Sequence, residues 1–219
     1  MYNITLICTA HREQGKCNVD ELCKIFENIS PEIIFEEIHS NRFDAYYKEK
    51  NVSTLETKAI IKYLHNHQIK HIPVDYYEVP DIIHFYKEVD YMNKIIFDNC
   101  DEYCLLSEER QSSLIQYGFG YLNGDIYSNL SRRLAFLEEN VINRIDDENL
   151  SRIYKLWLEF NSNREDEMLK NIYNYSKEHC YNNAILIIGA EHKNSINKKI
   201  QEYKINEEIL LNWKSWHIA

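Results

Sequence analysis

Short apolar runs alternate with amphipathic stretches over the first 80 residues. Residues 3–9 form an apolar run that predicts a strand entering the core. Between about 19 and 29, apolar positions recur every three or four residues, which predicts a helix with one buried face. Asn18, with Glu21 three residues later, has the spacing of an N-terminal cap for this helix.

Two further apolar runs continue the alternation. Residues 32–38 and 72–75 predict a second and a third strand. Between them we expect a helix from about 53 to 68, because Ser53 and Glu56 have the spacing of a capping box. This βαβαβ order favours a parallel sheet with right-handed crossovers.

The pattern turns helical from about 81 to 160 and becomes rich in charge and tyrosine. We interpret this stretch as a helical insertion packed over one edge of the sheet. Three of the five glycines lie within residues 117–124. That segment is expected to be either a lid loop or, as the more common case, an ordinary loop between helices.

The alternation of predicted helices and strands resumes after residue 161. Ser162 and Glu165 have capping-box spacing and predict a helix that ends near residue 179. Residues 184–188 are five consecutive apolar side chains, which is typical of a strand buried on both faces. A further helix should follow residue 192, and residues 209–216 are expected to dock as a last helix.

Together these elements predict an α/β fold with a mostly parallel central sheet flanked by helices. We expect a single domain over residues 1–219. It would comprise a βαβαβ half (1–80), a helical insertion in the middle of the chain (81–160) and a returning αβα half (161–219). The hydrophobic content of 44% is ample for one packed core.

Charge and targeting features narrow the function classes. The formal net charge is −10, and no basic stripe exists that would track a phosphate backbone, so nucleic acid is not the expected partner. A cationic or neutral small molecule, or a peptide, fits this bulk charge better. No apolar run approaches the ~20 residues needed to cross a bilayer, and the N-terminus lacks a basic region. We therefore expect a cytoplasmic protein without a membrane partner; its oligomeric state is left open.

Polar residues follow four of the predicted strands. His11 follows the first, Glu36 and Glu37 end the second, Asp75 ends the third, and His192 follows the last. In open parallel sheets the ligand crevice lies beyond the carboxyl ends of the strands, so these residues should meet at one edge. Each also has an ordinary structural interpretation, as a cap or a turn residue. Because neighbouring strand residues alternate in direction, only one of the two glutamates should face the site.

Arg164 is a further candidate. It falls in the expected first turn of the helix that Ser162 opens, where the partial positive charge of the helix disfavours a cation. An arginine at such a position usually has an acidic partner or an anionic ligand, and the carboxylates at the strand ends are candidates. The alternative is a solvated surface arginine.

Two short motifs at the ends of the domain carry a family resemblance. They are Cys8-Thr9-Ala10-His11 and Gly189-Ala190-Glu191-His192. With them, the chain resembles the superfamily of the TraB/PrgY proteins, the Tiki proteases, the erythromycin esterases and the haem-associated ChaN proteins, which is marked by paired G-x-x-H motifs. Cys8 stands where the first of these motifs has glycine.

Further matches lie between the two motifs. Pro31 through Glu37 resembles the Pro-x-x-x-x-x-Glu phrase of TraB-like proteins, and this register favours Glu37 over Glu36. Arg42 matches the arginine five positions after that glutamate. Arg164, ahead of a methionine-containing helix, resembles the family's downstream arginine. The resemblance covers about residues 3–78 and 162–200.

The resemblance implies hydrolysis, as a metal-dependent protease or as an esterase. Two imidazoles and a carboxylate, from His11, His192 and Glu37, can hold a divalent metal ion or can activate water without one. Arg164 and Asp75 would support the site. We therefore expect a hydrolase of an ester or amide bond acting on a small molecule or peptide. The alternative is a binding protein without chemistry, since the Cys8 side chain would narrow the site.

Overall fold

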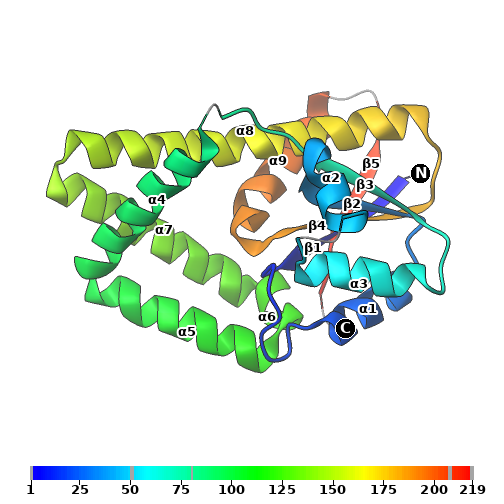
Figure 1. The fold of residues 1–219 in the computed structure, drawn as a ribbon, viewed down its shortest axis with the longest axis horizontal. Helices are drawn as coiled ribbons and strands as arrows, with labels where there is room; N and C mark the ends of the chain where they lie inside the picture. The colour runs from blue at the N-terminus through cyan, green and yellow to red at the C-terminus, as the bar shows by residue number, and fades with distance from the viewer. Residues whose placement is uncertain (1, 50–51, 80, 207–208, 218–219) are drawn as a thin grey trace.

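The computed structural model describes residues 2–49, 52–79, 81–206 and 209–217. Within them, five parallel strands form one sheet in the order β3-β2-β4-β1-β5 (Figure 1). The strands are β1 (Tyr2–Thr9), β2 (Ile33–His39), β3 (Lys70–Asp75), β4 (Asn183–Gly189) and β5 (Leu211–Ser215). The predicted α/β fold with a parallel central sheet is confirmed.

Helices cover both faces of this sheet. Helices α1 and α3 lie on one face and α8 and α9 on the other (Figure 1). The helices that connect or flank the strands are α1 (Val19–Ile29), α2 (Phe43–Tyr47), α3 (Leu55–Leu64), α8 (Glu148–Glu178) and α9 (Lys193–Asn206). Single 3₁₀ turns, η1 (Ser40–Arg42) and η2 (Ala190–His192), follow β2 and β4 directly.

Strands β1 and β4 are neighbours at the centre of the sheet. Their register pairs Cys8 with Ile188 and Thr9 with Gly189. Residues 184–188 are all buried, because helices cover the sheet on both faces, and this explains their unbroken apolar run. The first strand of the chain and the last one predicted from the sequence therefore end side by side.

The middle of the chain forms a helical arm beside the sheet, as predicted. Its helices are α4 (Ile82–Asp98), α5 (Asp101–Tyr117), α6 (Phe119–Asn123) and α7 (Asp125–Ile145). A second apolar cluster, which includes Phe85, Met92, Ile153 and Phe160, holds α4, α7 and the first half of α8 together. No helix in the described ranges is long and apolar enough to cross a membrane.

Helix α8 differs from the prediction of a helix that starts at Ser162. It begins at Glu148, where Asp147 caps it by accepting a hydrogen bond from the Leu150 amide, and it continues for 31 residues. The sequence between 148 and 178 contains neither glycine nor proline, so nothing interrupts the helix. Residue 162 is therefore an interior position, and the predicted boundary between insertion and returning half lies inside one helix.

The C-terminal segment is a strand, so the predicted last helix is wrong. Leu211–Ser215 pairs in parallel with the outer edge of β1, and the Trp216 amide extends this pairing to the Leu6 carbonyl. The tryptophans at 213 and 216 have helix-like spacing. The edge of β1 nevertheless offers this short segment hydrogen bonds that local sequence does not reveal.

The glycine-rich segment 117–124 is not a loop. It contains α6, which is separated from α5 by Gly118 and from α7 by Gly124. Gly118 has a φ of 57°, which favours glycine, and a β-carbon at this position would lie 2.6 Å from the backbone of Lys16. The Asn123 side chain accepts a hydrogen bond from the Cys8 amide and donates one to the Cys8 carbonyl, which holds the segment against β1.

Candidate functional site

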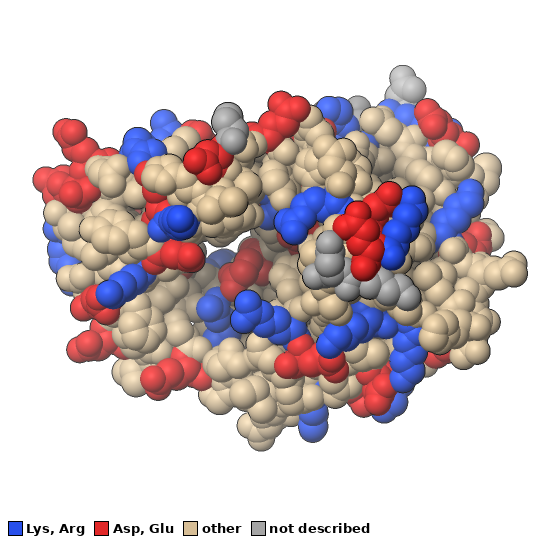
Figure 2. All heavy atoms as spheres, in the orientation of Figure 1, with Lys and Arg blue, Asp and Glu red and all other residues tan. Residues whose placement is uncertain are grey.

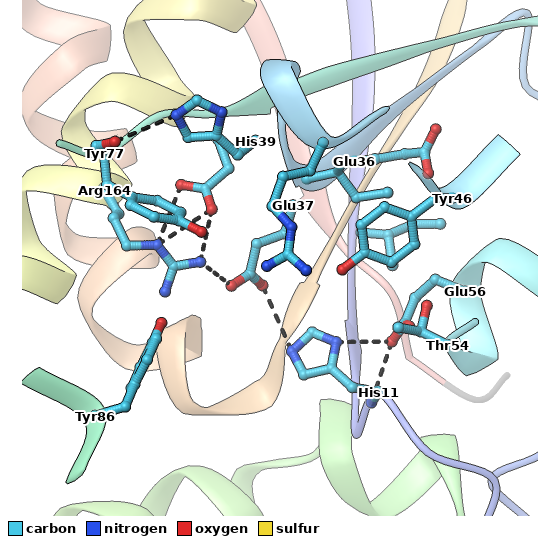
Figure 3. A pocket seen from close by; sticks show the side chains of 14 residues that line it. His11, Glu36, Glu37, His39, Tyr46, Thr54, Glu56, Tyr77, Tyr86 and Arg164 are labelled. Carbon is cyan, nitrogen blue, oxygen red and sulfur yellow. Dashed lines mark hydrogen bonds and ion pairs between the residues drawn. The ribbon is translucent and has the colours of Figure 1, made fainter. Parts of the chain in front are cut away.

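A cavity of about 210 Å³ lies at the carboxyl ends of the strands. Figure 2 shows the molecule hollowed between α4 and the α/β part on this face. Figure 3 shows the side chains that line the cavity, with Glu37 between His11 and Arg164. The lining residues are His11, Glu36, Glu37, Ile38, His39, Arg42, Tyr46, Thr54, Glu56, Asp75, Tyr77, Tyr86, Arg164 and Ile187.

His11 occupies a strained turn directly after β1. Its φ of 58° lies in the left-handed region, which costs about 1 kcal/mol or more for a residue with a side chain. Two backbone hydrogen bonds hold this conformation: its carbonyl accepts from the Leu55 amide, and its amide donates to Glu56 Oε1. The turn directs a half-exposed imidazole into the cavity.

Glu56 fixes the orientation of that imidazole. Its Oε1 lies 3.2 Å from His11 Nδ1 and also accepts a hydrogen bond from the Thr9 hydroxyl. Burial alone would lower the pKa of His11, but the hydrogen bond and charge of Glu56, with a contribution from Glu37, raise it to about 9. His11 Nδ1–H therefore donates to Glu56, while Nε2 faces the cavity.

The pairing of Glu56 with His11 was not predicted from the sequence, because the spacing of Glu56 from Ser53 predicted a capping box instead. In the structure Thr54 is the N-cap of α3 and forms the box with Thr57. Glu56 is therefore not needed for capping. Its second oxygen, Oε2, is buried and has no hydrogen-bond partner in the described part of the chain.

Glu37 is the centre of the site. Its Oε1 accepts a 2.6 Å hydrogen bond from Arg164 and lies 3.2 Å from His192 Nε2. Its Oε2 accepts a hydrogen bond from the Gly189 amide and lies 3.8 Å from His11 Nε2. Burial alone would raise the pKa of Glu37, but His192, Arg164 and His11 together hold it far below its usual value. The carboxylate is therefore ionised.

Gly189 lets these groups approach one another. A β-carbon at this position would lie 2.6 Å from His11 Nε2 and 3.4 Å from Glu37 Oε2. The glycine of the second motif is thus explained by the space that the imidazole from the first motif occupies.

His192 lies behind Glu37 and is buried. Its Nδ1 forms a 2.8 Å hydrogen bond with Glu165 Oε1, and its Nε2 faces Glu37. Burial alone would lower the pKa of His192, but the charge of Glu37 and the hydrogen bonds to Glu165 and Glu37 raise it to about 9. Glu165 also accepts a hydrogen bond from Ser195, so its position is fixed from two sides.

Arg164 joins Glu37 to Asp75. Its Nε and Nη2 both donate to the Asp75 carboxylate, and its guanidinium lies over the rings of Tyr77 and Phe160. The carboxylate partners expected for Arg164 are present. The predicted position of Arg164 in the first turn of a helix is wrong, because residue 164 is in the middle of α8. The packing of α8 against β3 places the Arg164 side chain beside Asp75, at the end of that strand.

Glu36 points away from His11 (Figure 3). It accepts a hydrogen bond from the Tyr47 hydroxyl, and its Oε1 lies 2.8 Å from His71 Nδ1. Burial raises the pKa of Glu36 despite these two partners. Of the two adjacent glutamates, only Glu37 contacts His11 and His192, as the alternation of strand residues requires.

Cys8 does not enter the site. Its side chain is buried in the core and is not among the residues that line the cavity. Burial raises the pKa of its thiol to about 12, so the thiolate is scarcely populated at neutral pH.

A metal ion does not fit this arrangement of donors. Within the ranges that the structure describes, no group of three or more His, Cys, Asp or Glu side chains is arranged to hold one. Both oxygens of Glu37 already accept hydrogen bonds, and one of them contacts the Arg164 cation. The divalent metal ion that the sequence suggested stays a prediction.

Comparisons with protein-family models, with curated proteins and with solved structures find no match to this chain.

Proposed function

We propose that this chain hydrolyses an ester or amide bond by attack of a water molecule that His11 activates. One observation carries the proposal. His11 Nδ1 is held by a buried carboxylate, while Nε2 lies in the cavity, 3.8 Å from Glu37 and thus beyond hydrogen-bond distance. The neutral ring, which predominates above its pKa of about 9, has a free lone pair at Nε2 where a water molecule can bind, so turnover should rise as the pH approaches 9.

The reaction needs no covalent intermediate on the protein. Water attacks the carbonyl carbon as its proton moves to His11 Nε2, and a tetrahedral intermediate forms. When the carbon–oxygen or carbon–nitrogen bond breaks, His11 returns the proton to the leaving group. The Glu56 carboxylate stabilises the imidazolium between these two steps.

The other site residues keep this arrangement in place. Glu37 receives hydrogen bonds from the Gly189 amide and from Arg164, which Asp75 in turn orients. The positive charges of Arg164 and His192 neutralise Glu37 and lower the energy of negative charge that develops nearby.

A binding protein without chemistry and a metal-dependent hydrolase are the two alternatives, and experiment distinguishes each from water activation by His11. The binding-protein hypothesis depended on a Cys8 side chain that narrows the site, and that side chain lies outside the cavity lining. A metal-dependent hydrolase would contain metal on elemental analysis and would lose activity on treatment with a chelator. Water activation by His11 alone predicts that a chelator leaves turnover unchanged.

The test is turnover of a panel of esters and peptides by the wild type and by the variants His11→Ala and Glu37→Gln. Loss of the general base should reduce kcat by about 10²- to 10⁴-fold. Glu13→Gln is the control, because Glu13 is a surface carboxylate paired with Lys58. Full activity of His11→Ala would overturn the proposal. Binding without turnover on every substrate would favour the binding role instead.

A further inference from the structure

Arg42 is the cavity-lining cation that has no carboxylate partner among the residues that the structure describes. It ends the turn η1, directly after β2, and lines the cavity together with Tyr46. Among the described residues its guanidinium has no ion pair and no hydrogen bond. Its one assigned contact is with the ring of Tyr46, 6.0 Å from the centroid.

The charges around Arg42 are otherwise compensated. Each of the other charged side chains in the lining contacts a carboxylate, a guanidinium or an imidazole: Arg164 with Asp75 and Glu37, His11 with Glu56, and Glu36 with His71. A ligand therefore meets carboxylates that are already neutralised and one guanidinium that is not. A guanidinium binds carboxylate and phosphate groups with paired, charge-assisted hydrogen bonds.

The walls of the cavity are aromatic. Tyr46, Tyr77 and Tyr86 line it from three separate segments: helix α2, the stretch after β3, and helix α4 of the helical arm. In Figure 3 these rings surround the space in front of Glu37 and His11. Phenol rings pack well against flat or ring-shaped groups and offer a hydroxyl at the rim.

We propose that the substrate is anionic: a ring-bearing ester or amide whose carboxylate or phosphate group binds Arg42. This inference rests on the proposed hydrolysis and names the class of molecule hydrolysed. It differs from the expectation based on net charge, which favoured a cationic or neutral ligand. The bulk charge of −10 is spread over the surface, whereas Arg42 acts at the cavity itself.

The kinetic test compares a neutral ester with a matched anionic one, 4-nitrophenyl acetate with the mono-4-nitrophenyl ester of succinic acid. The wild type should prefer the anionic ester in kcat/KM. Arg42→Gln should reduce this preference by about 10- to 100-fold, because a hydrogen bond to a charged group is lost, and Arg42→Lys should retain part of it. Arg12→Gln is the matched control, since Arg12 is an exposed arginine next to His11 in sequence that does not line the cavity.

A binding measurement distinguishes failure of this inference from failure of the proposed hydrolysis. Benzoate and phenyl phosphate are titrated against the wild type and Arg42→Gln by NMR, with benzamide as the neutral analogue. Anion binding that Arg42→Gln weakens, without any turnover, supports the inference and contradicts hydrolysis. Turnover with an anion preference that Arg42→Gln leaves unchanged overturns the inference alone. Equal binding of benzoate, phenyl phosphate and benzamide also overturns it.

Discussion

The Nε2 atom of His11 lies 2.6 Å from the point that a β-carbon would occupy at Gly189. The two residues are 178 positions apart in sequence, and the pairing of β1 with β4 brings them together. The imidazole can point towards Glu37 only because residue 189 has no side chain. This relationship links the two motifs that the sequence presents separately.

Replacing Gly189 should therefore act on His11. In Gly189→Ala the new methyl group would displace the ring, and a misplacement of about 1 Å costs on the order of 100-fold in rate. Ester turnover by the variant measures this loss. In a His11→Ala background the same substitution should cause little further loss, because the ring it displaces is absent. Additive losses in the double variant would contradict the argument.

Removal of the Glu56 charge should lower the pKa of His11. Burial lowers the pKa of this imidazole, and the hydrogen bond and charge of Glu56 make the largest contribution that raises it. In Glu56→Gln we expect the His11 pKa to fall from about 9 towards its ordinary value near 6.5. NMR titration of the His11 ring protons reports this pKa directly, without any need for turnover. Glu13→Gln should leave the titration unchanged, and an unaltered midpoint in Glu56→Gln would refute the assignment.

Loss of His192 should destabilise the fold as well as the site. The ring lies between the buried carboxylates of Glu37 and Glu165, and His192→Ala leaves both without this partner. Breaking a buried ion pair costs about 3–5 kcal/mol in the free energy of unfolding. Urea unfolding measures the change. The control is His84→Ala, an exposed position where a change within about 0.5 kcal/mol is expected.

Stability should also depend on pH in a defined direction. His11 and His192 have pKa values raised to about 9 from 6.5, so the stability they contribute is complete below about pH 6.5 and lost as pH rises through 9. The pKa of Glu37 is lowered, so its contribution is present above about pH 4.5 and lost on acidification. The urea midpoint should therefore fall between pH 7 and 9.5. This fall should be smaller in His192→Gln, and equal slopes in the two proteins would contradict the assignment.

The sheet and the placement of its strand ends were predictable from sequence. The apolar runs at 3–9, 32–38, 72–75 and 184–188 each became a strand, because runs of that length bounded by polar residues have few alternatives in an α/β chain. Their carboxyl ends brought His11 and His192 around the carboxylate of Glu37. Strand β5 was missed because its pairing with β1 is a tertiary effect.

The carboxylates that orient the two histidines were present in the sequence but were misassigned. Glu56 and Glu165 each stand three residues after a serine, which is the spacing of a capping box. Thr54 and Asp147 supply the actual caps. Local spacing cannot show that a glutamate faces an imidazole from a distant strand, so only the folded chain assigns these two residues.

Helix α8 is one continuous rod that belongs to both parts of the molecule. Its first half, with Leu150 and Ile153, packs in the helical arm, and its second half, with Met168 and Ile172, packs against the sheet. Arg164 lies at the junction. Because α8 is continuous, any movement of the helical arm relative to the sheet displaces the Arg164 guanidinium and with it the hydrogen bond to Glu37.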